Sequence, residues 1–122
     1  MRNEEHQLQK NIIKWINLKY PKLLYCASAG GVRTSFKQAI KMKQTGYIKG
    51  FPDLFIYEPV DQYHGLAIEV KTKKGRPTKH QLDWRHKLNE RNYISEITYG
   101  FDETIELIER YLTGKISKLN EN

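Results

Sequence analysis

The spacing of apolar residues divides this chain into two kinds of segment. Four segments repeat apolar residues every three to four positions, the period of an amphipathic helix; they cover residues 4–20, 35–45, 78–90 and 102–112. Four shorter segments are rich in β-branched and aromatic residues, as strands are; they cover residues 23–28, 53–57, 65–71 and 92–99. The order helix, strand, helix, strand, strand, helix, strand, helix predicts an α/β fold in which helices flank a small, mixed, four-stranded β-sheet.

Polar residues and glycines mark where the helices begin and end. Thr78 is followed three residues later by Gln81, the pattern of a capping box that opens a helix. Asp102 is a suitable cap for the last helix, which the following Thr-Gly pair should end. No internal repeat or linker separates these elements. We therefore expect one domain over residues 1–114 and a polar C-terminal tail over residues 115–122.

Composition narrows the class of protein. The chain has 122 residues, enough for one modest core, and its 21 Lys and Arg against 14 Asp and Glu give a formal charge of +7. Such a charge attracts polyanions, which include nucleic acids, acidic membranes and acidic proteins. The single cysteine, Cys26, excludes an internal disulfide and is expected to be buried on an apolar strand. No signal peptide or membrane span is visible, so we expect a cytoplasmic protein.

Two of the predicted strands carry charged residues at unusual positions. Asp53 opens one strand, and Glu69 and Lys71 lie within the next. Because strand side chains alternate between faces, Glu69 and Lys71 share one face while the apolar residues between them share the other. If the two strands pair antiparallel through the short loop that joins them, Asp53 comes near Glu69 and Lys71 at one end of the sheet.

This predicted convergence indicates a site for a divalent cation. Two neighbouring carboxylates repel each other unless a cation lies between them. Mg²⁺ prefers oxygen ligands, and it could activate a water and polarise a phosphate there, with Lys71 stabilising the transition state. The alternative is that Glu69 and Lys71 form an exposed pair on a half-solvated strand, while Asp53 only ends a Pro-Asp turn.

The context of these charges resembles a known family. Pro52-Asp53 followed by Glu69-Val70-Lys71 is the arrangement of the PD-(D/E)XK nuclease superfamily. The segments EHQLQ, SAGGVRTS, GFPDL, GLAIEVKTKKGRPTKHQ and YGFDETIELIERYL further resemble the VRR-NUC family, the virus-type replication-repair nucleases, over nearly the whole chain. The resemblance implies a PD-(D/E)XK restriction-endonuclease-like fold and a Mg²⁺-dependent deoxyribonuclease in which Mn²⁺ can substitute.

The resemblance also implies which residues hold the metal. The acid on the opening helix matches Glu5, held directly or through water, although its neighbour Glu4 stays an alternative. The other ligands would be the carboxylates of Asp53 and Glu69 and the main-chain carbonyl of Val70.

The catalytic set implied by the resemblance comprises Asp53, Glu69, Lys71 and Gln81. Lys71 matches the family's catalytic lysine. Gln81 matches a glutamine expected near the site, and its role in the capping box is an equally good explanation.

Basic residues flank the predicted acids on both sides. Each one alone is more typical of a solvated surface, but their clustering favours contact with DNA phosphates. The candidates are Arg33, Lys37, Lys41, Lys49, Lys73, Lys74, Arg76 and Lys79. The four histidines are scattered without the spacing of a zinc site, and we expect neither a small-molecule cofactor nor a membrane partner.

The substrate follows less directly from the sequence. No base-reading motif is present, so recognition of DNA shape is favoured over sequence-specific cutting. The resemblance implies a homodimer that cuts branched DNA such as Holliday junctions, in repair, recombination or phage replication within a bacterial or phage-infected cell. Trp84, Tyr93 and Tyr111 are candidate dimer contacts but are more typical of a core. Two alternatives stay open: a restriction-like nuclease on linear duplex, and a non-catalytic DNA-binding module with the same fold.

Overall fold

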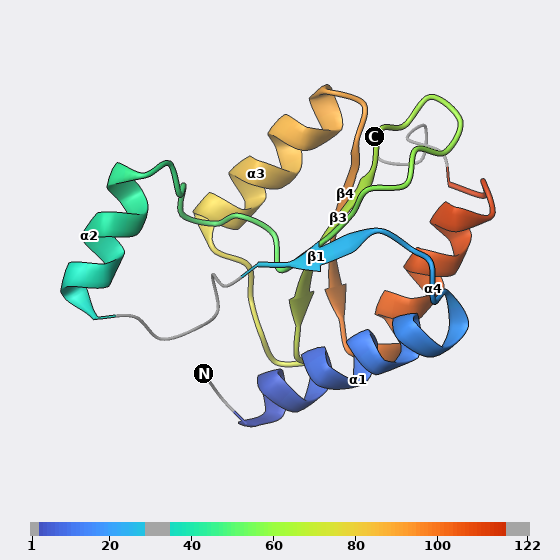
Figure 1. Ribbon diagram of the computed structural model, residues 1–122, viewed down its shortest axis with the longest axis horizontal. Helices are drawn as coiled ribbons and strands as arrows, with labels where there is room; N and C mark the ends of the chain where they lie inside the picture. Colours follow the sequence, from blue (N-terminus) through green and yellow to red (C-terminus); the bar gives the residue numbers. More distant parts are fainter. Residues whose placement is uncertain (1–2, 29–34, 117–122) are drawn as a thin grey trace.

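The computed structural model describes residues 3–28 and 35–116 (Figure 1). The elements follow the predicted order, and the predicted α/β class with a four-stranded sheet is confirmed. They are α1 (Asn3–Lys19), β1 (Tyr25–Ala27), α2 (Phe36–Gln44), β2 (Leu54–Ile56), β3 (Leu66–Lys71), α3 (Lys79–Glu90), β4 (Ile94–Tyr99) and α4 (Phe101–Leu112).

The sheet is mixed, with strand order β1-β2-β3-β4. β1 pairs antiparallel with β2, and β2 antiparallel with β3, the arrangement that lets a short loop join β2 to β3. β3 and β4 run parallel because α3 crosses between them. In the register of β2 and β3, Leu54 lies opposite Ile68, so the antiparallel pairing that brings Asp53 toward Glu69 is present.

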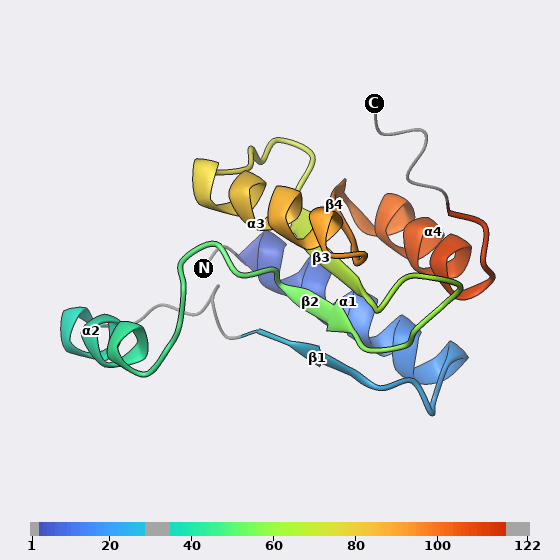
Figure 2. The same cartoon turned by 90° about the horizontal axis from the view of Figure 1, so that it is seen from above.

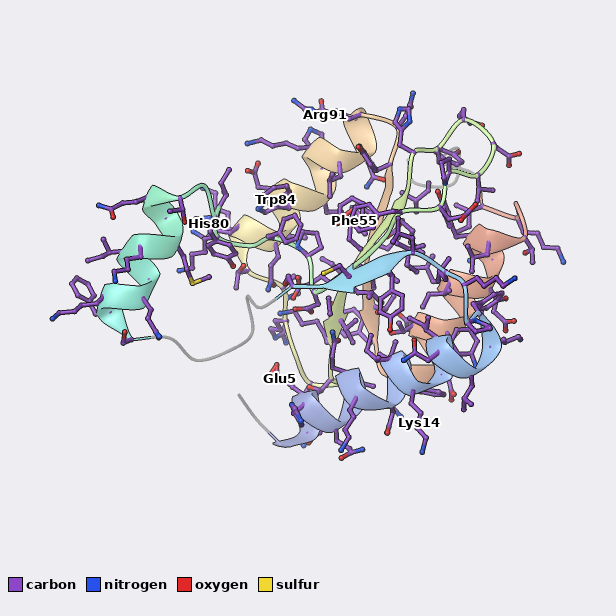
Figure 3. All side chains as sticks on the ribbon, in the orientation of Figure 1. Glu5, Lys14, Phe55, His80, Trp84 and Arg91 are labelled. Atoms are coloured by element: carbon purple, nitrogen blue, oxygen red, sulfur yellow. The ribbon has the colours of Figure 1, made fainter. Side chains whose placement is uncertain are left out.

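The two faces of the sheet are covered by different helices, as Figure 1 shows. On one face, α1 and α4 pack against the side chains of Leu66, Ile68 and Val70 in a large apolar cluster. On the other face, α3 packs against Phe55 and Ala67 in a smaller cluster. Figure 3 shows Trp84 of α3 and Phe55 of β2 on this side. Strand alternation therefore divides β3 between two environments.

The three aromatic residues considered as dimer contacts lie in these clusters. Tyr111 is only 1% exposed, and its hydroxyl donates to the carbonyl of Glu58 at 2.7 Å. Trp84 and Tyr93 are partly buried against the cluster under α3. Their contribution is to the core, which was the other role that the sequence allowed.

The structure confirms the predicted cap of α3 and contradicts the predicted cap of α4. Thr78 caps α3 in a full capping box with Gln81, as predicted. The prediction that Asp102 caps α4 is wrong, because the helix begins one residue earlier, at Phe101, after Gly100 with φ of 90°. Glu103 accepts a hydrogen bond from the Tyr99 backbone at this helix start instead. Asp102 lies in the first turn, where its charge suits the helix dipole.

Cys26 is exposed, which corrects the expectation of a buried thiol. It lies in β1, one of the two edge strands of the sheet, where two of the three residues are exposed. Apolar composition overestimates the burial of this strand because it does not reveal which strands lie at the edges of the sheet.

α2 differs from the other helices because none of its residues is buried. It lies apart from the layers of the fold in both Figure 1 and Figure 2. Of the predicted tail, residues 117–122 fall outside the described part of the chain. Within the described residues, no helix combines the length and apolar character needed to cross a membrane.

Candidate active site

The site is built where β3 extends beyond the start of β2. Asp53 immediately precedes β2, and its backbone carbonyl accepts a hydrogen bond from the Ser28 amide at 2.8 Å. Its side chain points toward β3, where Oδ2 accepts a hydrogen bond from the Val70 amide at 2.9 Å. Asp53 therefore takes the place of a backbone partner for β3, and the Pro-Asp turn does more than end a loop.

The backbone of β3 presents a carbonyl to the same place. Within a strand, the N–H and C=O of one residue point to the same side, and successive residues point to opposite sides. The Lys71 carbonyl faces β4, where it accepts from the Gly100 amide at 2.8 Å. The Val70 carbonyl consequently faces the opposite side, toward Asp53.

Glu69 lies inside the protein rather than on a solvated face. Only 7% of the residue is exposed. Its Oε2 accepts a hydrogen bond from Gln81 Nε2 at 2.8 Å and lies 3.7 Å from Lys71 Nζ. Its Oε1 is buried and makes no hydrogen bond within the part of the chain that the structure describes. An exposed pair on a half-solvated strand is thus excluded for Glu69 and Lys71.

Gln81 performs both of the roles that the sequence left open. Its Oε1 accepts a hydrogen bond from the Thr78 amide at 2.9 Å, which closes the capping box. Its Nε2 donates to Glu69 at 2.8 Å. The start of α3 and the carboxylate of β3 are therefore held together by one side chain.

The electrostatics of the two carboxyls reflect their burial. Burial raises the pKa of Glu69, and the nearby charge of Asp53 raises it further, while Lys71 opposes both effects. Burial also raises the pKa of Asp53, with a smaller contribution in the same direction from Glu5. In this environment the two acids favour their neutral, protonated forms, and they are ionised together only when a cation compensates both charges.

An open cavity of about 640 Å³ joins these groups. Glu5 lines it from the first turn of α1 (Figure 3), and its neighbour Glu4 does not. The predicted residues that line the cavity are Glu5, Lys49, Asp53, Glu69, Val70, Lys71 and Gln81. The structure does not bring Glu5 into a tight cluster with the other acids, since among the described residues no three His, Cys, Asp or Glu side chains are close enough to hold a metal.

The predicted DNA-binding residues lie in separate places. Lys73, Lys74 and Arg76 line a second hollow, of about 650 Å³. The walls of the two hollows are close, because a Cβ added at Gly75 in the second would lie 3.3 Å from the Lys71 side chain, which lines the first. The remaining predicted residues are Lys79, exposed in the first turn of α3, and Lys37 and Lys41, exposed on α2. Arg33 falls outside the described residues.

Sequence reasoning missed three side chains around these hollows. Tyr47 and His6 line the first cavity, and Tyr99 lines the second. Burial raises the pKa of the Tyr47 hydroxyl, and the charges of Glu69 and Asp53 add to this effect. Tyr99 could have been found from the parallel register, because it pairs with Lys71. Tyr47 precedes the GFPDL segment in a loop, where no periodicity indicates its direction.

Comparison with known proteins gives a consistent result. A model of the VRR-NUC domain family matches residues 2–102. A solved structure described as a "VRR_NUC domain protein" is 25% identical to this chain, with a TM-score of 0.79 over 93% of this chain and 91% of the other. The comparison with curated proteins found no match.

Proposed function

This chain belongs to the VRR-NUC family of nuclease domains, and on that basis we propose that it is a Mg²⁺-dependent endonuclease that hydrolyses phosphodiester bonds in branched DNA such as Holliday junctions. The observation that carries the proposal is the buried Glu69, held beside Asp53 and Lys71 in an open cavity with one carboxylate oxygen left without a hydrogen bond among the described residues. A protein that only binds DNA gains nothing from holding two repelling acids side by side, one of them buried and the other partly buried.

The residues present fit a hard divalent cation. Asp53, Glu69 and the Val70 carbonyl offer oxygen ligands close to one another at the end of β3. Because bound Mg²⁺ usually keeps several water ligands, a few ligands from the protein are enough. Glu5, on the cavity wall, would contribute through water. Mg²⁺, or Mn²⁺ in its place, would supply polarisation of the phosphodiester and a bound water of lowered pKa.

Lys71 and Gln81 would serve the reaction by position. The Lys71 side chain is 13% exposed and extends to within 3.7 Å of Glu69, so its ammonium faces the cavity where a phosphate would lie. There it would stabilise the negative charge that develops on the phosphate oxygens. Gln81 would act as a positioning residue because it holds Oε2 of Glu69 and leaves Oε1 for the cation.

The basic residues support a substrate held by its backbone. Lys49 lies on the wall of the first cavity, and Lys73, Lys74 and Arg76 line the adjoining hollow, so one strand could pass from one to the other. A homodimer would present two such sites to the two symmetric strands of a junction, within DNA repair, recombination or phage replication in a bacterial or phage-infected cell.

A cleavage assay tests this function directly. The full chain should cut a four-way junction faster than linear duplex of the same sequence with Mg²⁺ or Mn²⁺, and should cut neither with EDTA. Asp53→Asn and Lys71→Ala should each lower the cutting rate at least about 100-fold. Asp102→Asn, an exposed acid of α4, is the matched control and should cut as the parent does. Cutting by Asp53→Asn at the parental rate would refute the assignment of the site.

A further inference from the structure

α2 is the least explained element of the fold. It has nine residues, none of them buried, and it extends away from the sheet and its helices in Figures 1 and 2. A helix this short gains little stability by itself in water, although the capping box of Ser35 and Gln38 supports its first turn. A helix held clear of the core in this way has its side chains available for a partner.

The surface of α2 carries two adjacent strips of different character. Phe36 and Ile40, four residues apart, form an apolar strip, and they are 82% and 42% exposed. Lys37 and Lys41 repeat the same spacing one position along and form a basic strip. The helix contains no Asp or Glu. Its positive charge therefore complements a polyanion such as DNA.

The base of α2 is anchored next to the active-site cavity. Tyr47 and Lys49, just after the helix, line that cavity. Trp84 of α3 donates a hydrogen bond from Nε1 to the Lys49 carbonyl at 3.1 Å. Gly50 has φ of 92°, and a Cβ there would lie 2.6 Å from the His80 backbone, so the chain and α3 touch at this point. α2 therefore extends from a fixed position beside the cavity that contains Asp53 and Glu69.

We propose that α2 is the element that selects branched DNA, with Lys37 and Lys41 on phosphates of one duplex arm and Phe36, supported by Ile40, on a base face exposed at the branch point. This inference rests on the proposed nuclease function and deepens it. A continuous duplex hides every internal base face in its stack, whereas a branch point interrupts the stack. Aromatic stacking on a base adds affinity whatever the sequence. The apolar strip thus adds affinity for branched DNA only, and the basic strip for any duplex.

Binding without cleavage separates the two strips. The full chain is titrated in EDTA against a labelled four-way junction and against linear duplex of the same sequence, with fluorescence anisotropy as the readout. Phe36→Ala should weaken junction binding by about 5- to 150-fold, the range expected for one stacked base, and change duplex binding less than about twofold. Leu18→Ala is the matched control, because Leu18 is 77% exposed on α1, and it should change neither affinity.

Removal of the basic strip should give a different pattern. Lys37→Gln with Lys41→Gln should weaken junction and duplex binding by the same factor. It should also lower the slope of log affinity against log salt concentration by about 2, one unit for each phosphate that the variant no longer neutralises. Circular dichroism of each variant should match that of the parent, since neither strip contributes to the core.

The proposal is overturned if Phe36→Ala binds both DNAs as the parent does, or loses both equally. Light scattering identifies the rival occupant: if Phe36→Ala converts a dimer to a monomer, the apolar strip is a contact between two copies of this chain. A parent protein that cuts DNA while Phe36→Ala keeps its junction preference would refute the role of α2 and leave the nuclease function intact. A parent that neither binds nor cuts DNA would refute the nuclease function itself.

Discussion

The two faces of β3 differ in polarity, since one is apolar and the other carries charged side chains. On the face toward α1 and α4, Ile68 is fully buried among apolar neighbours. On the face toward α3, Glu69 is almost as buried, but its neighbours are another acid, a lysine and a glutamine. The first face lowers the free energy of the fold by burying apolar area, and the second costs free energy because it buries charge. One strand thus combines a stabilising face with a face suited to chemistry.

The largest effect is expected from the apolar face. Ile68→Ala removes a fully buried side chain between α1, α4 and the sheet, and should lower the free energy of unfolding by about 2–5 kcal/mol. Denaturant unfolding measures this loss. Cutting per folded molecule, measured well below the melting temperature, should stay close to that of the parent. Leu24→Ala, at a residue 67% exposed, should change neither quantity. A stable Ile68→Ala protein without activity would show that the two faces are not separable.

The opposite result is expected on the other face. Glu69→Gln keeps the shape of the side chain and removes a carboxyl whose ionisation burial opposes. Cutting should therefore fall at least about 100-fold, while the protein gains stability at neutral pH in the absence of metal. The two measurements together test whether Glu69 is kept for chemistry. A loss of both activity and stability would contradict the distinction between the faces.

The pH dependence of stability should also reveal the buried carboxyl of Glu69. Burial, and then the charge of Asp53, raise the pKa of Glu69 in the folded protein. As pH rises above about 4.3, the ordinary value for glutamate, the unfolded chain releases this proton while the folded protein retains it. Stability should therefore fall as pH rises. With EDTA, the melting temperature of the parent should fall between about pH 5 and 8 more than that of Glu69→Gln. Equal slopes would show that this carboxyl is not the titrating group.

The smallest effect is expected where α3 meets the charged face. Gln81→Leu removes both the hydrogen bond to Glu69 and part of the capping box, whereas Thr78→Ala removes only the cap. Thr78→Ala should lose about 1 kcal/mol of stability, and Gln81→Leu should lose more because buried Glu69 also loses a hydrogen bond. Only Gln81→Leu should also lose activity, by about 10- to 100-fold, as other residues that position a metal ligand do. If Thr78→Ala loses as much activity, the cap alone positions α3 for the reaction.

Much of the fold and part of the site could be predicted because they depend on local pattern. Helical and alternating periods indicated the order of all eight elements, and alternation placed Glu69 and Lys71 on one face. The predictions from sequence were wrong where exposure or capping depends on neighbouring elements. Cys26 is exposed on β1, a short strand at one edge of the sheet with no buried residue. Asp102 is not a cap because α4 begins at Phe101, which places Asp102 inside the first turn. The position of Tyr47 on the cavity wall could not be predicted, because a loop has no repeating hydrophobic pattern.

The sequence by itself determined which residues of one strand face the same way, because backbone geometry fixes side-chain direction within a strand. Only the tertiary structure decided that Asp53 bonds to the Val70 amide, that Gln81 bonds to both Thr78 and Glu69, and that α2 stands clear of the core. The physical reason is that burial depends on what packs against a group. The burial that raises the pKa of Glu69 comes from residues distant in sequence, which no local pattern records.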